Sequence, residues 1–332
     1  MGTGATFTLH KFRKYPFGSQ HTISGNAAFS TGSFNLNYDG IFTRAVGPAD
    51  LLINTEVAVP NSRTNFFGFG NETPEINNSD FHRVRVDQVF LSSLLRYRLI
   101  PSISFEAGPS FEVFNPKGNQ DRFVRSAASE IDKDEFELQP FLGLTGNIRF
   151  DFTDGGVVRK EGLSALLGAK TTHAFKEQEP FLTLKGMLRY YKPIHKLNTT
   201  FATRFGMARN IGNFQFFQAN TLGGQTNNDI NAALLNTGNF RGLTRHRFSG
   251  RTVFYQNTDL RIAVKKVDSF FIPGELGILG FVDHGRVWNS DLSSKKWHVG
   301  SGGGIWFNAL NKFIIKASWA TSDIDQTITI GM

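Results

Sequence analysis

The sequence has no cysteine, few prolines (11 in 332 residues) and no apolar run of about 18 residues. Without cysteine, disulfides and thiolate metal sites are excluded. Without a long apolar run, a membrane-spanning helix is excluded, since such a helix needs about 20 consecutive, mostly apolar residues. The chain also shows no secretory signal peptide, because residues 1–12 already alternate between polar and apolar side chains.

Functional motifs are scarce as well. Lysine and arginine outnumber aspartate and glutamate by 36 to 28, a net charge of +8, but they are scattered and form no nucleic-acid-binding motif. The 8 histidines show neither His-x-x-x-His nor His-Glu-x-x-His spacing. Ser249 and His246 lie close together, but such pairs arise by chance. We therefore predict no nucleic-acid partner, no cofactor, no metal site and no enzymatic activity in this segment.

Phenylalanine and glycine are abundant, with 34 of each. Aromatic residues favour strands, and glycines favour tight turns. Polar and apolar residues alternate along most of the chain, and residues 33–40, 147–152, 259–264 and 313–319 each place apolar side chains on one face. A period of two is typical of β-strands, and no segment has the pattern of an amphipathic helix.

From this alternation we predict about fifteen strands, at residues 5–13, 20–30, 33–43, 50–60, 82–98, 102–115, 138–151, 162–175, 180–193, 196–208, 248–266, 273–288, 295–308, 312–321 and 326–332. Many of them reach the roughly ten residues with which a tilted strand crosses a bilayer, whereas strands of globular proteins average about five or six.

The predicted connections fall into two classes. Short turns alternate along the chain with connections that include three long polar loops, at 61–81, 116–137 and 209–247. This asymmetry is typical of a transmembrane antiparallel β-barrel, which has short periplasmic turns and longer outside loops. Closing the sheet also removes the exposed edges that so many strands would create. A soluble all-β protein is the alternative.

The number of strands bears on completeness. Bacterial barrels of this type have an even strand number. If the long loops lie outside, the segment at 5–13 is the second strand, and a first strand lies upstream of Met1. We therefore expect residues 1–332 to be a single outer-membrane β-barrel domain, the C-terminal fragment of a longer protein. About 16 strands are expected in the intact barrel, and the first strand and any periplasmic or soluble domain lie upstream.

Several motifs together resemble one family. In chain order they are Asn65–Glu75 (NFFGFGNETPE), Phe150–Gly162 (FDFTDGGVVRKEG), Leu222–Gly224 (LGG), Phe240–Leu243 (FRGL), Gln256–Ile262 (QNTDLRI), Gly280–Trp288 (GFVDHGRVW) and Gly300–Phe307 (GSGGGIWF). Their order and spacing are similar to the C-terminal barrel of the BamA/TamA surface-antigen superfamily, which includes barrels that insert or translocate other outer-membrane proteins. The chain departs from the family at Leu243, where an aromatic is usual, and at its TITIGM end, where many barrels have an aromatic.

The resemblance implies a bacterial outer-membrane barrel in which a long loop folds back into the lumen. In the family this loop follows the eleventh of sixteen strands, which fits the predicted strands 196–208 and 248–266 only if the first strand is missing. The loop glycines here are Gly223 and Gly224, and Phe281 and Gly285 belong to the matching strand motif. Some members carry an upstream phosphoesterase domain in place of periplasmic modules.

The resemblance also implies that the loop arginine, Arg241, meets acids of the inner wall, here Asp283 and Asp259. Both acids alternate with apolar residues on neighbouring predicted strands, so both should point into the lumen. A guanidinium offers five donors in a fixed fork and stays charged, so it can satisfy both carboxylates. Gly242 should let the loop backbone pass close to the wall, and Phe240 or Leu243 should pack beside it.

The last predicted strand suggests how such a barrel would work. It is short and contains threonine and glycine, so we expect a weak seam at Thr327, Ile328, Thr329, Ile330 and Gly331. The expected function is insertion or translocation of outer-membrane proteins, with outer-membrane lipid, unfolded client proteins and accessory envelope proteins as partners. Two alternatives are a membrane anchor or passive channel for an upstream phosphoesterase-like domain, and a porin-like channel.

Overall fold

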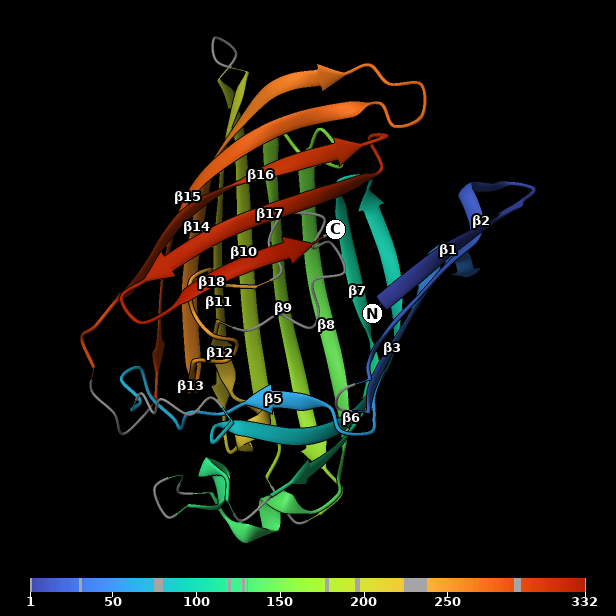
Figure 1. Cartoon of the computed structure of the whole chain (residues 1–332). Coiled ribbons are helices and arrows are strands. Elements are labelled where there is room, and N and C mark those ends of the chain that lie inside the picture. The colour runs from blue at the N-terminus through green and yellow to red at the C-terminus, as the bar shows by residue number, and fades with distance from the viewer. Residues whose placement is uncertain are drawn as a thin grey trace.

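Long antiparallel strands make up nearly all of the computed structural model, which describes residues 2–29, 32–74, 80–118, 121–126, 129, 131–176, 179–194, 198–223, 238–289 and 294–331. Fifteen strands pair in chain order: β1 (Gly2–Lys11), β2 (Lys14–Ala28), β3 (Ser33–Val46), β4 (Ala49–Ala58), β6 (Arg83–Ile100), β7 (Ile103–Lys117), β8 (Gln139–Thr153), β9 (Gly162–Ala174), β10 (Phe181–Ile194), β11 (Thr199–Ile211), β14 (Thr252–Val267), β15 (Gly274–Trp288), β16 (His298–Ala309), β17 (Phe313–Ser322) and β18 (Gln326–Gly331). The prediction of an all-β meander of about fifteen strands is confirmed (Figure 1).

The alternation of polar and apolar residues in the sequence gives each strand two chemically different faces. On β8, Leu142 and Leu144 are 50% and 65% exposed and point outward, while Asn147 on the other face is buried. Apolar side chains that face outward suit lipid, because hydrocarbon offers no hydrogen bonds to polar groups. Within the described residues, no helix is long and apolar enough to cross a membrane.

Among the described residues, three short strands lie outside the meander. β5 (Arg63–Asn65) pairs with the start of β6, and β12 (Asn220–Leu222) pairs with β13 (Phe248–Gly250) in a separate small sheet. The predicted strand at 248–266 is therefore wrong at its start, because β13 belongs to the preceding loop and the wall strand begins at Thr252. The apolar alternation continues across this break, so the pattern could not locate it.

The two ends of the sheet differ. One end carries short turns, for example at 12–13, 47–48, 101–102 and 310–312, and we call it the turn end. The other end carries the long connections at 59–82, 118–138 and 212–251, and we call it the loop end. The loops there pack into a phenylalanine-rich core with the first residues of β6, made of Phe66, Val84, Val86, Phe123, Val124 and Phe216. The phenylalanines of these mostly polar loops thus form a buried cluster and are not exposed to solvent.

The sheet has two edges, β1 and β18, and no pairing joins them in the described part of the chain. In Figure 1, β1 and β2 lie apart from β18. Because the meander is antiparallel and has fifteen strands, β1 and β18 run in the same direction, from the loop end to the turn end. Direct antiparallel pairing of these two strands is therefore excluded.

Candidate functional site: the lumen loop

The connection between β11 and β14, residues 212–251, is here called the lumen loop, and its described residues 212–223 and 238–251 enter the lumen. Its described parts are held together by the β12–β13 pair and by Asn239. The side chain of Asn239 accepts a hydrogen bond from Gly223 N at 2.8 Å and donates one to Thr221 O at 2.6 Å. Gly223 has φ +87°, a conformation that suits glycine. Gly224, predicted to act with it, lies outside the described residues.

Arg241 reaches two carboxylates of the wall. Its backbone N and its Nε both donate to Oδ2 of Asp283 at 2.8 Å, and its Nη2 donates to Oδ1 of the same residue. Its Nη1 lies 2.8 Å from Oδ1 of Asp259. Asp283 is fully buried, and Asp259 also accepts from Arg261 at 2.9 Å. The structure thus brings together the arginine and both acids that the sequence placed on the lumen face.

The surroundings keep Arg241 charged. Its guanidinium carbon lies 3.6 Å from the ring centroid of Phe281, an arrangement in which a cation is attracted to the ring face. Burial lowers the pKa of Arg241, but the charges of Asp259 and Asp283 outweigh burial, so the pKa lies above its ordinary value. Phe281, predicted only as part of a strand motif, therefore contacts the arginine directly.

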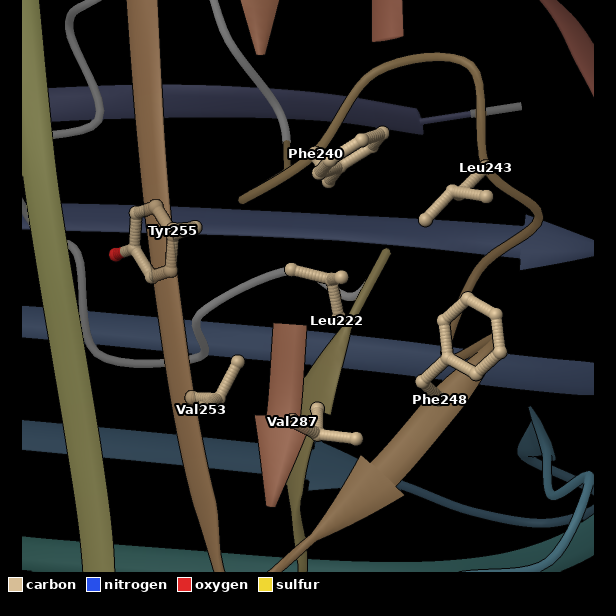
Figure 2. Close-up of a cluster of buried hydrophobic side chains, with 7 residues drawn as sticks. All are labelled: Leu222, Phe240, Leu243, Phe248, Val253, Tyr255 and Val287. Carbon is tan, nitrogen blue, oxygen red and sulfur yellow. The ribbon is translucent and has the colours of Figure 1, made fainter. Parts of the chain in front are cut away.

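Apolar side chains fix the loop beside this ion cluster. Phe240 and Leu243, which flank the arginine and glycine, are 3% and 5% exposed. They belong to a cluster drawn in Figure 2, made of Leu222, Phe240, Leu243, Phe248, Val253, Tyr255 and Val287. Gly285 leaves room for Leu222, since a Cβ there would lie 2.7 Å from Leu222 Cδ1. Both residues predicted to pack beside the motif are buried in this cluster.

A glycine of the next strand lets the loop approach. A Cβ on Gly300 of β16 would lie 2.4 Å from the carbonyl oxygen of Arg241 and 2.8 Å from Cε1 of Phe240. The glycine-rich stretch at the start of β16 therefore has a packing function at this position. Sequence reasoning identified the stretch but not which glycine the loop contacts.

The loop also binds the terminal hairpin, which consists of β17, the turn at 323–325 and β18. Gly242 N donates to Oγ1 of Thr327 at 3.1 Å, and Gly242 O accepts from Oγ of Ser322 at 2.7 Å. Gly242 has φ +83°, and a Cβ there would lie 2.9 Å from the carbonyl carbon of Thr321. Both the backbone conformation and the close approach therefore require glycine.

One more contact joins the loop to the hairpin turn. Oδ2 of Asp325 accepts from Thr244 N at 2.9 Å and from Thr244 Oγ1 at 2.6 Å. Ser322 and Asp325 were not among the predicted site residues, because their sequence indicates a turn but not its partner. The lumen loop thus has two anchors, the acids of β14 and β15 and the terminal hairpin.

The predicted seam residues form the edge strand β18. Within the described part of the chain they pair with β17 alone, from Ala320↔Thr327 to Lys316↔Gly331. Ile328 and Ile330 are 76% and 78% exposed and alternate with Thr327, which contacts the loop. Of the five predicted residues, Thr327 is therefore the one with a described contact to the lumen loop.

The remaining candidate residues form no reaction centre in the described part of the chain. Ser249 is 1% exposed, and its carbonyl oxygen accepts a hydrogen bond from Gly70 N. His246 Nδ1 hydrogen-bonds Oγ1 of Thr64 at 2.6 Å. Among the described residues, no group of three His, Cys, Asp or Glu side chains has the arrangement of a metal site.

A long antiparallel meander, apolar outside, with a loop arginine on two lumen acids, defines a transmembrane β-barrel with a docked lumen loop. Residues 7–310 match the Omp85 superfamily domain, and the chain belongs to the Omp85 superfamily. The barrels of this family lie in the bacterial outer membrane, insert or translocate proteins, and are themselves non-enzymatic.

Solved structures share this fold at low sequence identity. BamA from Haemophilus ducreyi lacking POTRA domains 1-3 has 13% identity and a TM-score of 0.62 over 100% of this chain and 68% of that one. CdiB from Acinetobacter baumannii has 12% identity and a TM-score of 0.61 over 98% and 53%, and CdiB from Escherichia coli has 10% and 0.54 over 99% and 61%. The chain thus spans about half to two thirds of these structures. The comparison with curated proteins found no match.

Proposed function

We propose that this chain is a bacterial outer-membrane barrel that assists the insertion or translocation of outer-membrane proteins through a weak seam at β18. An opened seam would offer a strand edge to which an unfolded client adds by β-augmentation. Outer-membrane lipid, client proteins and accessory envelope proteins are the proposed partners. The lumen loop would hold the barrel in shape while the seam opens.

The observation that carries this proposal is the double anchorage of the lumen loop. Arg241 is bonded to Asp283 on β15, and the next residue, Gly242, is bonded to Thr327 on the edge strand. A single rigid motif therefore connects the closed part of the wall with the strand that borders the gap. Such a connection would keep the rest of the wall in place while the edge strand moves.

The parity of the strands supports a further part of the proposal. Because β1 and β18 run in the same direction, an antiparallel closure needs one more strand between them. We propose that this strand precedes β1 and borders the seam on the other side. Residues 1–332 would then form a single barrel domain that is the C-terminal part of a longer protein.

A second function, a membrane anchor or passive channel for an upstream soluble enzyme domain, accounts for the same fold. The packed phenylalanine core of the loops argues against a porin-like open channel, because it lies over the loop end of the lumen. It does not separate an anchor from an insertase. The domain upstream would separate them, since small repeated α/β modules favour assembly and a metal-binding hydrolase favours an anchor.

The decisive test measures the folding of a client. The full-length protein and this segment are each placed in liposomes, and a urea-unfolded second barrel protein is added. The readout is the rate at which the client becomes folded and protease-resistant, with empty liposomes as the control. Acceleration by both supports insertase activity in this barrel, and acceleration by the full-length protein alone makes the upstream part essential. The absence of any acceleration would contradict the proposal and favour the anchor.

A further inference from the structure

A segment of the first long connection crosses the loop end of the barrel, and we call residues 64–74 the strap. It begins at β5, which is paired with β6 in the N-terminal half of the sheet through Thr64↔Val84 and its neighbours. In Figure 1, β5 and the segment after it run across this end of the sheet from β6 toward β13. The strap therefore leaves one part of the wall and reaches another without following the sheet.

The strap first binds the lumen loop. Three of the hydrogen bonds that join them are Asn65 Nδ2 to Arg245 O at 2.9 Å, Thr64 Oγ1 with His246 Nδ1 at 2.6 Å, and Gly70 N to Ser249 O at 2.8 Å. Two of these bonds involve backbone carbonyls of the loop, so they depend on the path of its chain. The contacts lie C-terminal to Arg241 and are separate from its ion pairs.

Arg247 fastens the strap more deeply. Its side chain is 3% exposed, its Nη2 donates to Thr73 O at 2.9 Å, and its Nη1 donates to Thr73 Oγ1. Its guanidinium carbon lies 4.7 Å from the ring centroids of both Phe67 and Phe248. A desolvated cation between two aromatic rings is attracted to the negative face of each ring. One arginine of the loop thus holds two residues of the strap.

Asn71 then joins the strap to the C-terminal half of the wall. Its Oδ1 accepts from Val287 N at 2.9 Å, and its Nδ2 donates to Lys296 O at 2.8 Å and to Ser294 Oγ at 3.3 Å. Its carbonyl oxygen lies 2.9 Å from Nε2 of the fully buried His298. These partners lie at the end of β15, in the connection after it and at the start of β16, and Asn71 is itself 2% exposed.

The position of the strap limits how the barrel can open. Along the sheet, β1 to β4 lie between β6 and one edge, and β17 and β18 lie between β16 and the other edge. A strap from β6 to β15 and β16 is therefore a chord across the arc that contains the gap. While the chord is intact, β6 and the part of the wall formed by β15 and β16 cannot separate at the loop end, and this limits how far the two edges can move apart there. At the turn end no contact of the strap restrains them.

We propose that the strap, through Asn71 and Arg247, is a second restraint on the barrel that keeps the edge strands close at the loop end, so that the gap widens from the turn end. The strap residues are positioning residues in this scheme and do not contact a client. The link between widening and activity rests on the proposed function, whereas the restraint itself does not.

The test uses spin labels, which the absence of cysteine makes straightforward. Thr3→Cys with Gln326→Cys reports the loop end of the gap, and Leu9→Cys with Ile330→Cys reports the turn end. Distances are measured by double electron–electron resonance on the whole chain in lipid nanodiscs. In the otherwise unchanged protein, we expect a narrow distribution at the loop end and a broader one at the turn end.

The variant Asn71→Ala removes the side-chain bonds to Val287, Ser294 and Lys296. We expect the loop-end distance to increase by about one strand spacing, roughly 5 Å, or its distribution to broaden to that extent. Glu72→Ala is the matched control, because the neighbouring Glu72 is exposed and should leave both distances unchanged. Asn71→Asp keeps the acceptor for Val287 N and loses the donor to Lys296 O, so the loop-end distance should increase by less than in Asn71→Ala. This variant replaces Asn71→Ala if Asn71→Ala does not fold.

An unchanged loop-end distance in a folded Asn71 variant would overturn the restraint. The restraint would also be overturned if, in the protein without the Asn71 substitution, the distance distribution at the loop end were as broad as that at the turn end. Neither measurement involves a client. If the distances are as expected but the liposome assay shows no acceleration, the proposed function is rejected and the restraint by the strap is retained.

Discussion

Gly242 donates its backbone N–H to Oγ1 of Thr327 at 3.1 Å, which joins the lumen loop to a strand 85 residues further along the chain. The residue before Gly242 is the arginine that holds two buried acids of the wall. Because the two contacts come from adjacent residues, a shift of the edge strand cannot be accommodated by loop flexibility between them. The position of β18 and the ion cluster are therefore mechanically coupled.

Gly242→Ala should break this coupling. A Cβ at this position would lie 2.9 Å from the backbone of Thr321, and φ is +83°, so alanine is both strained and obstructed. We expect a loss of about 1–3 kcal/mol in the free energy of unfolding, measured by urea titration in lipid vesicles. Gly280→Ala is the matched control, because a Cβ there meets no atom within 4 Å. Equal stability of the two variants would show that the loop does not need its close approach.

Arg241→Ala should be more damaging. It would leave Asp283, which is fully buried, without the guanidinium that donates to both of its oxygens, so that only the backbone N–H of residue 241 would remain from this contact. Removing one member of a buried ion pair costs about 3–5 kcal/mol. We therefore expect the folded barrel to unfold at a lower temperature, measured as the loss of the folded band on gels of samples heated in steps. We also expect slower folding of the client. Arg241→Lys keeps the charge and loses the fork, so it should recover only part of the loss.

The control for Arg241 is an arginine in an exposed pair. Arg83→Ala removes the ion pair with Asp80, whose side chain is 58% exposed, and should change stability by less than about 1 kcal/mol. If Arg241→Ala behaves like Arg83→Ala, the ion cluster contributes neither stability nor support for the seam.

The wall strands and the lumen face were accessible to sequence reasoning because alternation is a local property. A residue such as Asp259 faces the lumen whenever its neighbours in sequence face lipid, and no knowledge of distant contacts is needed. The same reasoning placed Asp283 on that face. Sequence similarity to other barrels then indicated which loop arginine to examine.

The second anchor and the strap were not accessible, because each depends on the path of a loop through the lumen. Ser322 and Asp325 carry the signature of a turn, and nothing in it specifies Gly242 or Thr244 as partners. Phe66 and Phe216 belong to short phenylalanine clusters in otherwise polar loops, and no period in the sequence reveals their common core. The start of β14 was misplaced for a related reason, since Phe248 continues the alternation inside the loop.

Asp325→Ala should loosen the terminal hairpin at its turn. Asp325 accepts two hydrogen bonds from Thr244, and without them the loop end of β18 is held by Thr327 and Ser322 alone among the described loop contacts. We expect amide hydrogen exchange in β17 and β18 to become about tenfold faster, which corresponds to roughly 1.4 kcal/mol, with β10 and β11 unchanged. Asp268→Ala, in an exposed turn at the other end, should leave β18 unaffected, and faster exchange there as well would indicate general destabilisation.

Acidification should weaken the contact between the strap and the lumen loop through His246. Burial, and then the nearby charge of Arg245, lower the pKa of His246 from 6.5 to about 4. Glu56 also lies close enough to Arg245 to interact with it electrostatically. Between these two pKa values the unfolded chain binds more protons than the folded one, so the stability that neutral His246 contributes is complete above pH 6.5 and is lost as the pH falls toward 4.

The measurement compares the unfolding free energy of the natural chain and of His246→Asn from pH 7 to pH 4.5. Asparagine tolerates the positive φ of this position, +56°, and does not titrate. The difference between the two proteins should change by up to about 1.4 kcal/mol per pH unit below pH 6, with the natural chain losing stability faster. Parallel pH curves for both proteins would mean that His246 is protonated at no cost to the folded state, and that its hydrogen bond to Thr64 does not depend on the neutral ring.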